Sequence, residues 1–526
     1  MKITHTVQRL DSPESWSLLA DVLGGEHVDV VRNTIRHLRV LNAKSYVVEH
    51  PYIDQDYSAD YAQFYARTFR TYERHCKRVH FFSQDISPLL QRPLSTTQLS
   101  SLGDFAEQTY CGFCVIRPLS TAPIGRTVLQ ARVANGFNME ATVTCRADFD
   151  AHLLGTSLQV TGTSFLQQDT RVGACAQVAI WAGMRHMHAR YGYNWVSVAD
   201  ITRFARPPSA SEAASLPNAS DRLSSDAMVR AIAEAGYQPL SLFSRSDIGS
   251  AILPYVESGI PVILGLDLGG SLGHAVTVVG RVFAKQENPT NRAIDYVPAF
   301  IVHDDQSGPY MWLPADKDGS TKYSFGADTV KRDSTSGPIE LNVRCHAVVA
   351  IALMSTRVFS TAARAEHNAR SQIDDTLKAL PAARRTLAEL GMPVNELLLD
   401  ELQEAHLADS IVLRTYLTSA AGYRRHIAQG SASDDLKDAL LDLHLPHFTW
   451  ITEVSTVDSY NHASPGMRRI YGHTVMDATS AAERGDGLLV LHLPGLLITS
   501  DPSGLGPQEV TAIKDDKLYE CREKRL

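Results

Sequence analysis

The stretch QQDTRVGACAQVAIWAGMRHMHARYG, residues 167–192, decides the fold that we expect for this chain. Cys175 follows a Gly-Ala pair and opens an apolar run with helical spacing. One face of this helix would contain Ala176, Ile180, Gly183 and Met187. Most other positions are also apolar, so we expect a buried central helix. A thiol at a helix N-terminus lies near the positive end of the macrodipole and near free backbone N–H groups, which favour the nucleophilic thiolate.

Residues that could complete a nucleophilic site follow in chain order. His274 comes after a glycine-rich segment in SGIPVILGLDLGGSLGHAVTVVGR (258–281) and begins an alternating apolar strand. A second strand, in YVPAFIVHDDQSGPY (296–310), ends in two aspartates. Upstream of the cysteine stand two glutamines, whose amides can donate to an oxyanion. These are the parts that a nucleophilic cysteine requires: a base, a group that orients the base, and oxyanion donors.

This order of segments resembles papain-like cysteine peptidases, and within them most closely the bacterial C39 and C39-like group. The resemblance covers about residues 165–320. It implies an α+β fold with a papain-like core, in which the cysteine helix packs on an antiparallel sheet that carries the histidine and the aspartate. It also implies a cysteine peptidase that hydrolyses a peptide or isopeptide bond in a peptide or protein substrate.

The resemblance assigns a role to each candidate residue. Cys175 would be the nucleophile, His274 the general base, and Asp304 the group that orients the imidazole. The backbone N–H of Cys175 and the amide of Gln168 would stabilise the oxyanion. The family places its glutamine six residues before the cysteine, where this chain has Asp169, so Gln167 remains an alternate donor.

The choice between the two aspartates rests on strand parity. Asp304 shares parity with Phe300 and Val302, whereas Asp305 lies further into the turn and remains the alternate acid. His303 has the opposite parity and is the rival base.

Two other function classes stay open. An acyl or amide transferase, similar to transglutaminase-like and phytochelatin-synthase-like enzymes, would use the same cysteine, histidine and aspartate. A catalytically inactive papain-like module would bind a protein partner instead. The sequence does not distinguish water from an amine as the acyl acceptor.

Composition is ordinary for a globular protein of several domains, with 526 residues, 44% hydrophobic and 21% charged. A formal charge of −8 argues against nucleic-acid binding and against anionic membranes. Residues 1–9 lack the apolar core of a signal peptide, and no apolar run is long enough to insert into a bilayer. Seven cysteines in so long a chain favour reduced thiols and a cytoplasmic location.

No cofactor or metal site is expected, because the histidines form neither an HExxH nor an HxH cluster. The lone CxxC of Cys111 and Cys114 lies in a strand-like run and is interpreted as structural.

We expect three domains. Residues 1–145 form an N-terminal mixed α/β domain of unassigned role, 146–355 the papain-like catalytic domain, and 356–526 a C-terminal α+β accessory domain with helices before strands. The flanking domains should pack against the catalytic one, restrict access to it, and offer a place for a regulatory protein partner.

Three local predictions concern these flanks. AQFYARTFRTYERHC (62–76) is expected to be a helix, preceded by a solvated loop with Asp54, Asp56 and Asp60. VNELLLDELQEAHLADSIVLRTYLTSAAGYRRHIA (394–428) is expected to be helical.

Overall fold

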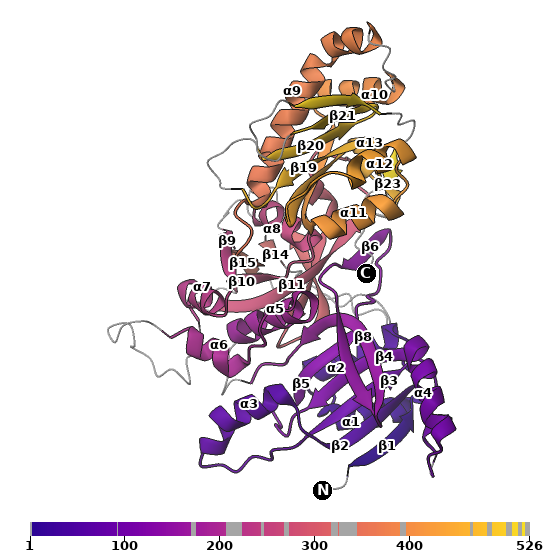
Figure 1. Cartoon of the computed structure of the whole chain (residues 1–526). Helices are drawn as coiled ribbons and strands as arrows, with labels where there is room; N and C mark the ends of the chain where they lie inside the picture. Colours follow the sequence, from indigo (N-terminus) through magenta and orange to yellow (C-terminus); the bar gives the residue numbers. More distant parts are fainter. Residues whose placement is uncertain are drawn as a thin grey trace.

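The computed structural model is an elongated α+β molecule in which three main sheets follow one another along the chain (Figure 1). The structure describes residues 3–91, 93–169, 175–206, 223–242, 247–267, 273–316, 324–325, 345–389, 396–462, 467–480, 487–500, 508–513 and 518–520. Every strand pairing within these residues is antiparallel. The described helices include none with the length and apolar character that crossing a bilayer requires.

The N-terminal part is a seven-stranded sheet in the order β1-β2-β3-β4-β5-β8-β7. Its strands are β1 (Thr4–Arg9), β2 (Ser45–Tyr52), β3 (Cys76–Phe82), β4 (Tyr110–Ile116), β5 (Ile124–Gln130), β7 (Ala147–Leu153) and β8 (Thr156–Phe165). Helices α1 (Pro13–Leu23) and α2 (Asp29–Val40) share one core with this sheet. Helices α3 (Gln55–Gln63) and α4 (Thr96–Thr109) share a second core. Two successive residues of β2, Tyr46 and Val47, belong to different cores, because successive strand side chains point to opposite faces.

Strand β6 (Met139–Val143) leaves this sheet and pairs with β11 (Gly273–Ala284) of the second one. The chain then returns, and β7 and β8 complete the first sheet. The predicted division at residue 145 therefore does not coincide with a division between sheets. Sequence periodicity identifies a strand but does not identify its partner, which is why this crossing was not predicted.

The second sheet closes on itself, because β10 pairs with both β11 and β15. Its ring consists of β10 (Val262–Asp267), β11, β12 (Ala299–Asp304), β13 (Gly308–Asp316), β14 (Ser324–Phe325) and β15 (Cys345–Met354). Strand β9 (Gln238–Leu242) pairs with β15 outside the ring. The strand predicted from His274 onward and the strand predicted within residues 296–310 are confirmed as β11 and β12.

Four helices accompany this barrel: α5 (Cys175–Tyr191), α6 (Val198–Phe204), α7 (Ser225–Glu234) and α8 (Ile248–Glu257). Helix α5 is buried over most of its length and packs against β10, β11 and β15. Gly183 permits the close approach, because a Cβ there would lie 2.5 Å from Leu353 Cδ1. The Thr277 hydroxyl of β11 also donates to the Ala179 carbonyl of α5 at 2.9 Å. These contacts fix helix α5, which begins with Cys175, to strand β11, which carries His274 near its start.

The C-terminal part begins with two helices and then alternates helices with strands, whereas helices followed by strands were expected. Its helices are α9 (Ala362–Glu389), α10 (Glu396–Leu407), α11 (Ala420–Gln429), α12 (Asp434–Leu441) and α13 (Val457–Tyr460). Its sheet consists of β16 (Ile411–Ser419), β17 (Phe448–Thr456), β19 (Gly472–Asp477), β20 (Leu488–Leu493), β21 (Leu496–Thr499) and β22 (Glu509–Ala512), with a separate pair β18 (Arg469–Ile470) and β23 (Tyr519–Glu520).

One helix prediction in this part is wrong. Residues 411–419, IVLRTYLTS, form strand β16 and pair with β17 along their whole length. β-Branched and aromatic residues dominate this segment, and they favour a half-buried pleated surface. The good helix formers on either side of it concealed that preference.

The expected helix at 62–76 is also wrong, because α3 ends at Gln63 and only a short 3₁₀ turn, Tyr65–Arg67, follows it there. Helix α3 begins seven residues earlier than expected, where the Asp54 carboxylate accepts a hydrogen bond from the Tyr57 N–H at 3.0 Å and caps the first turn. The three aspartates Asp54, Asp56 and Asp60 are buried rather than solvated. Asp56 accepts hydrogen bonds from Trp181 and Arg185, and so ties α3 to helix α5.

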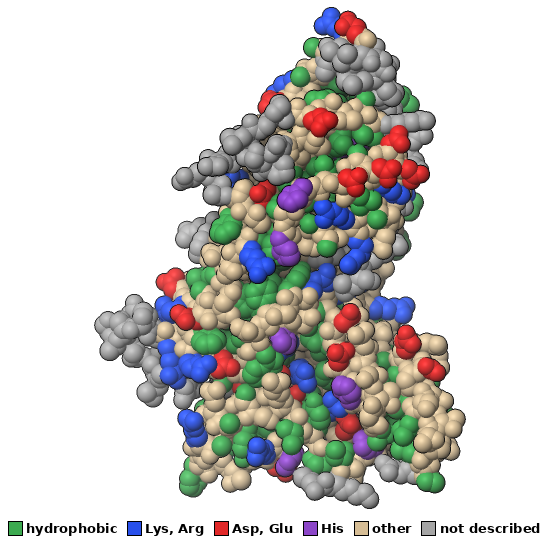
Figure 2. Space-filling model, viewed as in Figure 1, with side chains coloured by type: hydrophobic (Ala, Val, Ile, Leu, Met, Phe, Trp, Pro, Cys, Tyr) green, Lys and Arg blue, Asp and Glu red, His purple; other side chains and the backbone are tan. Residues whose placement is uncertain are grey.

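On the described part of the face drawn in Figure 2, acidic and basic side chains alternate, and no continuous basic surface is visible.

Candidate active site

Cys175 is the first residue of α5, as predicted, and its side chain is partly exposed. The other four cysteines whose side chains are described, Cys76, Cys111, Cys114 and Cys145, are fully buried. Burial raises the pKa of Cys111 and Cys114 to about 12, which keeps these thiols protonated and unreactive. Among these five cysteines, Cys175 alone combines access with a position at a helix N-terminus.

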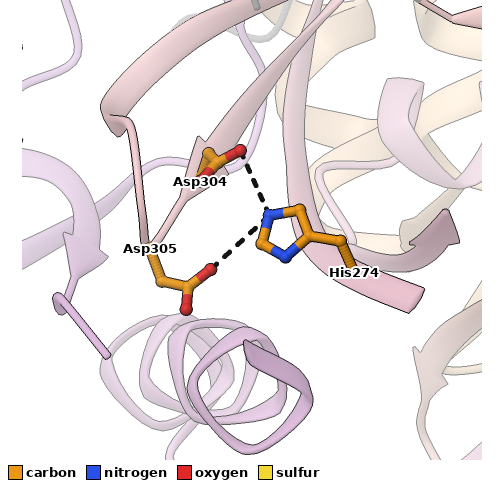
Figure 3. Close-up of side chains that lie close together, drawn as sticks. All are labelled: His274, Asp304 and Asp305. Carbon is orange, nitrogen blue, oxygen red and sulfur yellow. Dashed lines mark hydrogen bonds and ion pairs between the residues drawn. The ribbon is translucent and has the colours of Figure 1, made fainter. Parts of the chain in front are cut away.

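His274 stands at the start of β11, and its imidazole is mostly buried. Its Nε2 lies 3.2 Å from Asp304 Oδ2 and 3.7 Å from Asp305 Oδ1. Figure 3 shows both carboxylates directed at the same ring nitrogen. The turn after β12 thus brings both candidate acids to the candidate base.

The charge of the imidazole depends on these neighbours. Burial lowers the pKa of His274, but hydrogen bonds with Asp304 and Cys175, together with the two carboxylate charges, raise it to about 11. Asp304 occupies Nε2. Nδ1 is buried and makes no hydrogen bond within the described residues.

Asp304 is held rigidly in the turn. Its Oδ1 accepts hydrogen bonds from the backbone N–H groups of Gln306, at 2.8 Å, and Ser307, at 2.9 Å. Burial raises the pKa of Asp304, but the hydrogen bond and charge of His274, together with these N–H groups, lower it below its usual value. Asp304 is therefore a carboxylate, and it makes the hydrogen bond that strand parity assigns to it.

Asp305 is as buried as Asp304, but it differs in its hydrogen bonds, its pKa and its distance from His274. Within the described residues, neither of its oxygens accepts a hydrogen bond. Burial and the charge of Asp304 raise the pKa of Asp305 to about 8. Asp305 therefore contacts the imidazole at a longer distance and as a weaker acid.

The rival base His303 lies apart from this group. It is buried, and its Nδ1 is 3.1 Å from the Ser164 carbonyl of β8. Burial lowers the pKa of His303 to about 3, so the ring stays neutral.

The two glutamines have different surroundings. The Gln167 side chain is buried, and its Oε1 accepts a hydrogen bond from the Ile124 N–H of β5 at 3.1 Å. Arg117 donates to the Gln167 carbonyl at 2.8 Å. Gln168 is partly exposed. Residues 170–174, which connect Gln168 to Cys175, lie outside the described residues, so the oxyanion role of either glutamine stays a prediction.

Asn33 is a residue near the site that sequence analysis missed. Its side-chain Nδ2 donates to the Ser307 carbonyl at 2.8 Å, from α2 to the turn that carries Asp304. No local pattern could reveal this contact, because the two residues are 274 positions apart.

His274, Asp304 and Asp305 also form a group of the kind that binds a metal. One ligating atom from each lies within 4.8 Å of the others. The sequence predicted these three residues in one site as a base and its two alternate acids, but no metal site was expected.

No family model matches this sequence, and a search of curated proteins found no match. The argument for function therefore rests on the residues of this chain and their geometry.

Proposed function

We propose that this protein is a cysteine peptidase, which hydrolyses a peptide or isopeptide bond through Cys175, His274 and Asp304. The observation that supports this most strongly is the position of the His274 imidazole. Its Nε2 is 3.2 Å from the Asp304 carboxylate, while a hydrogen bond with the Cys175 thiol contributes to its raised pKa. A thiol, an imidazole and a carboxylate in this order are what nucleophilic catalysis by cysteine requires.

The reaction follows from these positions. His274 takes the thiol proton, and the Cys175 thiolate forms a bond to the substrate carbonyl carbon. The resulting oxyanion would be stabilised by the backbone N–H of Cys175 and by Gln168, and one such donor contributes ~3 kcal/mol. The imidazolium then protonates the leaving amine as the C–N bond breaks. His274 next deprotonates a water, which attacks the thioester and restores the thiol. Asp304 keeps the imidazole in the useful orientation throughout.

The proposal includes a papain-like core. The support is topological: α5 packs on an antiparallel barrel whose adjacent strands β11 and β12 carry His274 and Asp304. It also includes a cytoplasmic location, for which the five free cysteines are the support.

The first experiment measures thiol reactivity. Full-length protein is treated with iodoacetamide at pH 6, and the labelling rate of each cysteine is followed by mass spectrometry. Cys175 should react at least ~10-fold faster than the buried cysteines, because its thiol is partly exposed at the start of a helix. His274→Ala should remove this advantage. His188→Ala, an exposed histidine on the same helix, is the matched control and should retain it. A Cys175 rate within the range of the buried thiols would refute catalysis.

A second experiment separates hydrolysis from acyl transfer. Wild-type protein and Cys175→Ala are incubated with a peptide library, with and without an added primary amine. Cleavage products that depend on Cys175 and carry a free carboxylate support the peptidase. Products in which the amine has replaced the leaving group would identify a transferase.

A further inference from the structure

Two carboxylates, those of Asp304 and Asp305, approach the His274 imidazole, whereas a general base requires only one acid to orient it. Asp304 alone satisfies Nε2, and its other oxygen is held by two backbone N–H groups. Asp305 is only 4% exposed, and neither of its oxygens accepts a hydrogen bond within the described residues. A buried carboxylate without donors is costly, and it is retained where a cation binds it. Figure 3 shows this side chain directed at His274 Nε2.

The spacing of the three ligating atoms suits a small divalent cation. Zinc binds histidine nitrogen and carboxylate oxygen at ~2.0–2.2 Å, and tetrahedral geometry then places neighbouring ligand atoms ~3.4 Å apart. The distances from Nε2 to Asp304 Oδ2 and Asp305 Oδ1 are 3.2 and 3.7 Å, on either side of that value. All three ligating atoms lie within 4.8 Å of one another.

We propose that His274, Asp304 and Asp305 bind one zinc ion through Nε2 and one oxygen of each carboxylate. A water would complete the tetrahedron. Imidazole nitrogen among the ligands favours zinc over magnesium, which prefers oxygen ligands and retains most of its water. The two carboxylates balance the charge of the ion, so the buried group becomes neutral as a whole.

The regulatory consequence of the metal rests on the proposed function. When zinc takes the lone pair of Nε2, the imidazole proton resides on Nδ1, so neither ring nitrogen has a free lone pair. The ring can then no longer accept the Cys175 proton. Bound zinc is therefore an inhibitor that keeps the thiol protonated, and its removal by a chelator restores the base.

A single water is the competing occupant. A cavity of about 10 Å³ adjoins Asp305 and is also lined by Thr277 and His303. That volume holds at most one water, which would hydrogen-bond Asp305 without any metal. The two possibilities differ in one measurable respect, the affinity for zinc.

Zinc binding is tested by titrating the full-length, chelator-treated protein with Zn²⁺ in competition with a chromophoric chelator. Wild-type protein should bind one zinc ion that Mg²⁺ does not displace. Asp305→Asn should lower the affinity for zinc at least ~10-fold, which is the effect typical of losing one contributor to a metal site. Asp150→Asn, an exposed aspartate on β7, is the matched control and should bind zinc as wild type does. If Asp305→Asn does not fold, His274→Gln provides the same comparison.

Equal zinc affinity in wild type and Asp305→Asn, or no zinc binding by wild type, would overturn the metal site and leave water as the occupant. Iodoacetamide labelling in chelator-containing buffer reads the proposed catalysis separately. Fast labelling of Cys175 without zinc binding would support the peptidase and refute the zinc site. Tight zinc binding with slow labelling of Cys175 would support the zinc site and refute the peptidase. Where both hold, added zinc should slow the labelling of Cys175.

Discussion

Cys175, His274 and Asp304 contribute differently to the proposed reaction, and single substitutions should separate them. Cys175→Ala should reduce turnover to background, because it removes the proposed nucleophile, and His274→Ala should be nearly as severe. Asp304→Asn should retain some activity, because it removes orientation and charge but not the base. Asp305→Asn should cost less than Asp304→Asn, since only Asp304 makes the 3.2 Å hydrogen bond. Steady-state kinetics in chelator-containing buffer would check this order.

Circular dichroism of the same variants is the control for folding. If Asp305→Asn proves more damaging than Asp304→Asn, the wrong acid has been assigned to the imidazole. Gln168→Ala should lower turnover by ~10²–10³ with an unchanged melting temperature. Gln167→Ala should instead lower the melting temperature, because it leaves the buried Ile124 N–H without its acceptor.

Asp60 provides a pH-dependent prediction. Burial raises the pKa of Asp60 from 3.8 to about 8, against the attraction of Arg117. The folded state thus holds a proton that the unfolded chain loses near pH 3.8. The stability due to this proton is complete below pH 3.8 and is lost as the pH rises through about 8. Asp60→Asn, which resembles the protonated carboxyl, should therefore stabilise the protein increasingly between pH 5 and 9, as measured by thermal denaturation.

Asp56→Asn is the matched control on the same helix. It weakens the acceptor of Arg185 and Trp181, and so it should destabilise the protein at every pH in that range, by up to ~3–5 kcal/mol. A pH-independent effect of Asp60→Asn would show that its carboxyl titrates normally.

The candidate residues of the site were predictable because their chemistry is local. Cys175 begins a helix with the expected periodicity, and His274 and Asp304 mark the ends of strands with clear alternation. Their surroundings were not predictable. The burial of Asp60 and the contact of Asn33 with Ser307 depend on segments far apart in the chain. No periodicity within either segment encodes such contacts.

At the scale of secondary-structure elements, hydrogen bonds connect helix α2 to the turn after β12. Asn33 donates to the Ser307 carbonyl, and the Ser307 N–H donates to Asp304. Helix α2 of the N-terminal part thus supports the turn that carries Asp304, the residue hydrogen-bonded to the candidate base His274. Gly308 completes the turn at a φ of +142°, a conformation that other residues rarely adopt, and its Cβ position would lie 3.0 Å from Asn33 Cβ.

Asn33→Ala should therefore lower kcat several-fold with little change in KM, because the imidazole loses orientation while the substrate surface is untouched. Arg32→Ala, an exposed position on α2, is the matched control and should be neutral. The pH–rate profile distinguishes positioning from a merely structural effect. If Asn33 positions the imidazole, the pH values at which the rate rises and falls should shift in the variant. A general loss of folded protein would instead lower the rate by the same factor at every pH. An unchanged profile would remove Asn33 from the site.

Secondary-structure elements were predicted best where one pattern dominated. Helix α5, with its long apolar run, begins at Cys175 as expected. Strand β16 was missed because strong helix formers surround it. Helix α3 was missed because its acidic and aromatic residues resemble a solvated loop. In both cases tertiary packing decided between two local preferences of similar strength.

The three sheets are joined by shared cores at the scale of the whole molecule. The first core includes residues of α1 and α2 together with Val279, Ile301 and Trp312 of the barrel. The barrel and the C-terminal sheet share another core. A buried ion network crosses the second junction, where Glu257 of α8 accepts from Arg281 at 2.7 Å and from Arg414 of β16 at 2.5 Å. The expected packing of both flanks against the central part is thus present.

Residues 146–355 should therefore not fold when expressed alone. The fragment would expose the barrel face covered by the N-terminal helices and leave Glu257 without Arg414. A fragment of residues 1–360 keeps the first junction and is the comparison, with an intermediate stability expected. Circular dichroism and limited proteolysis would measure both. A stable, fully active 146–355 fragment would show that the flanks are dispensable.

Strand β6 makes the N-terminal sheet and the barrel one heritable unit. A recombination junction before β6 would transfer β7 and β8 away from the first sheet. A junction after β6 would remove the strand that pairs with Gly280 to Ala284 on one edge of β11, where only Gly280 to Val282 would keep β12 on the other edge. No crossover between β5 and β8 leaves both sheets whole. We therefore expect chimaeras that join the barrel to a foreign N-terminal sheet to misfold.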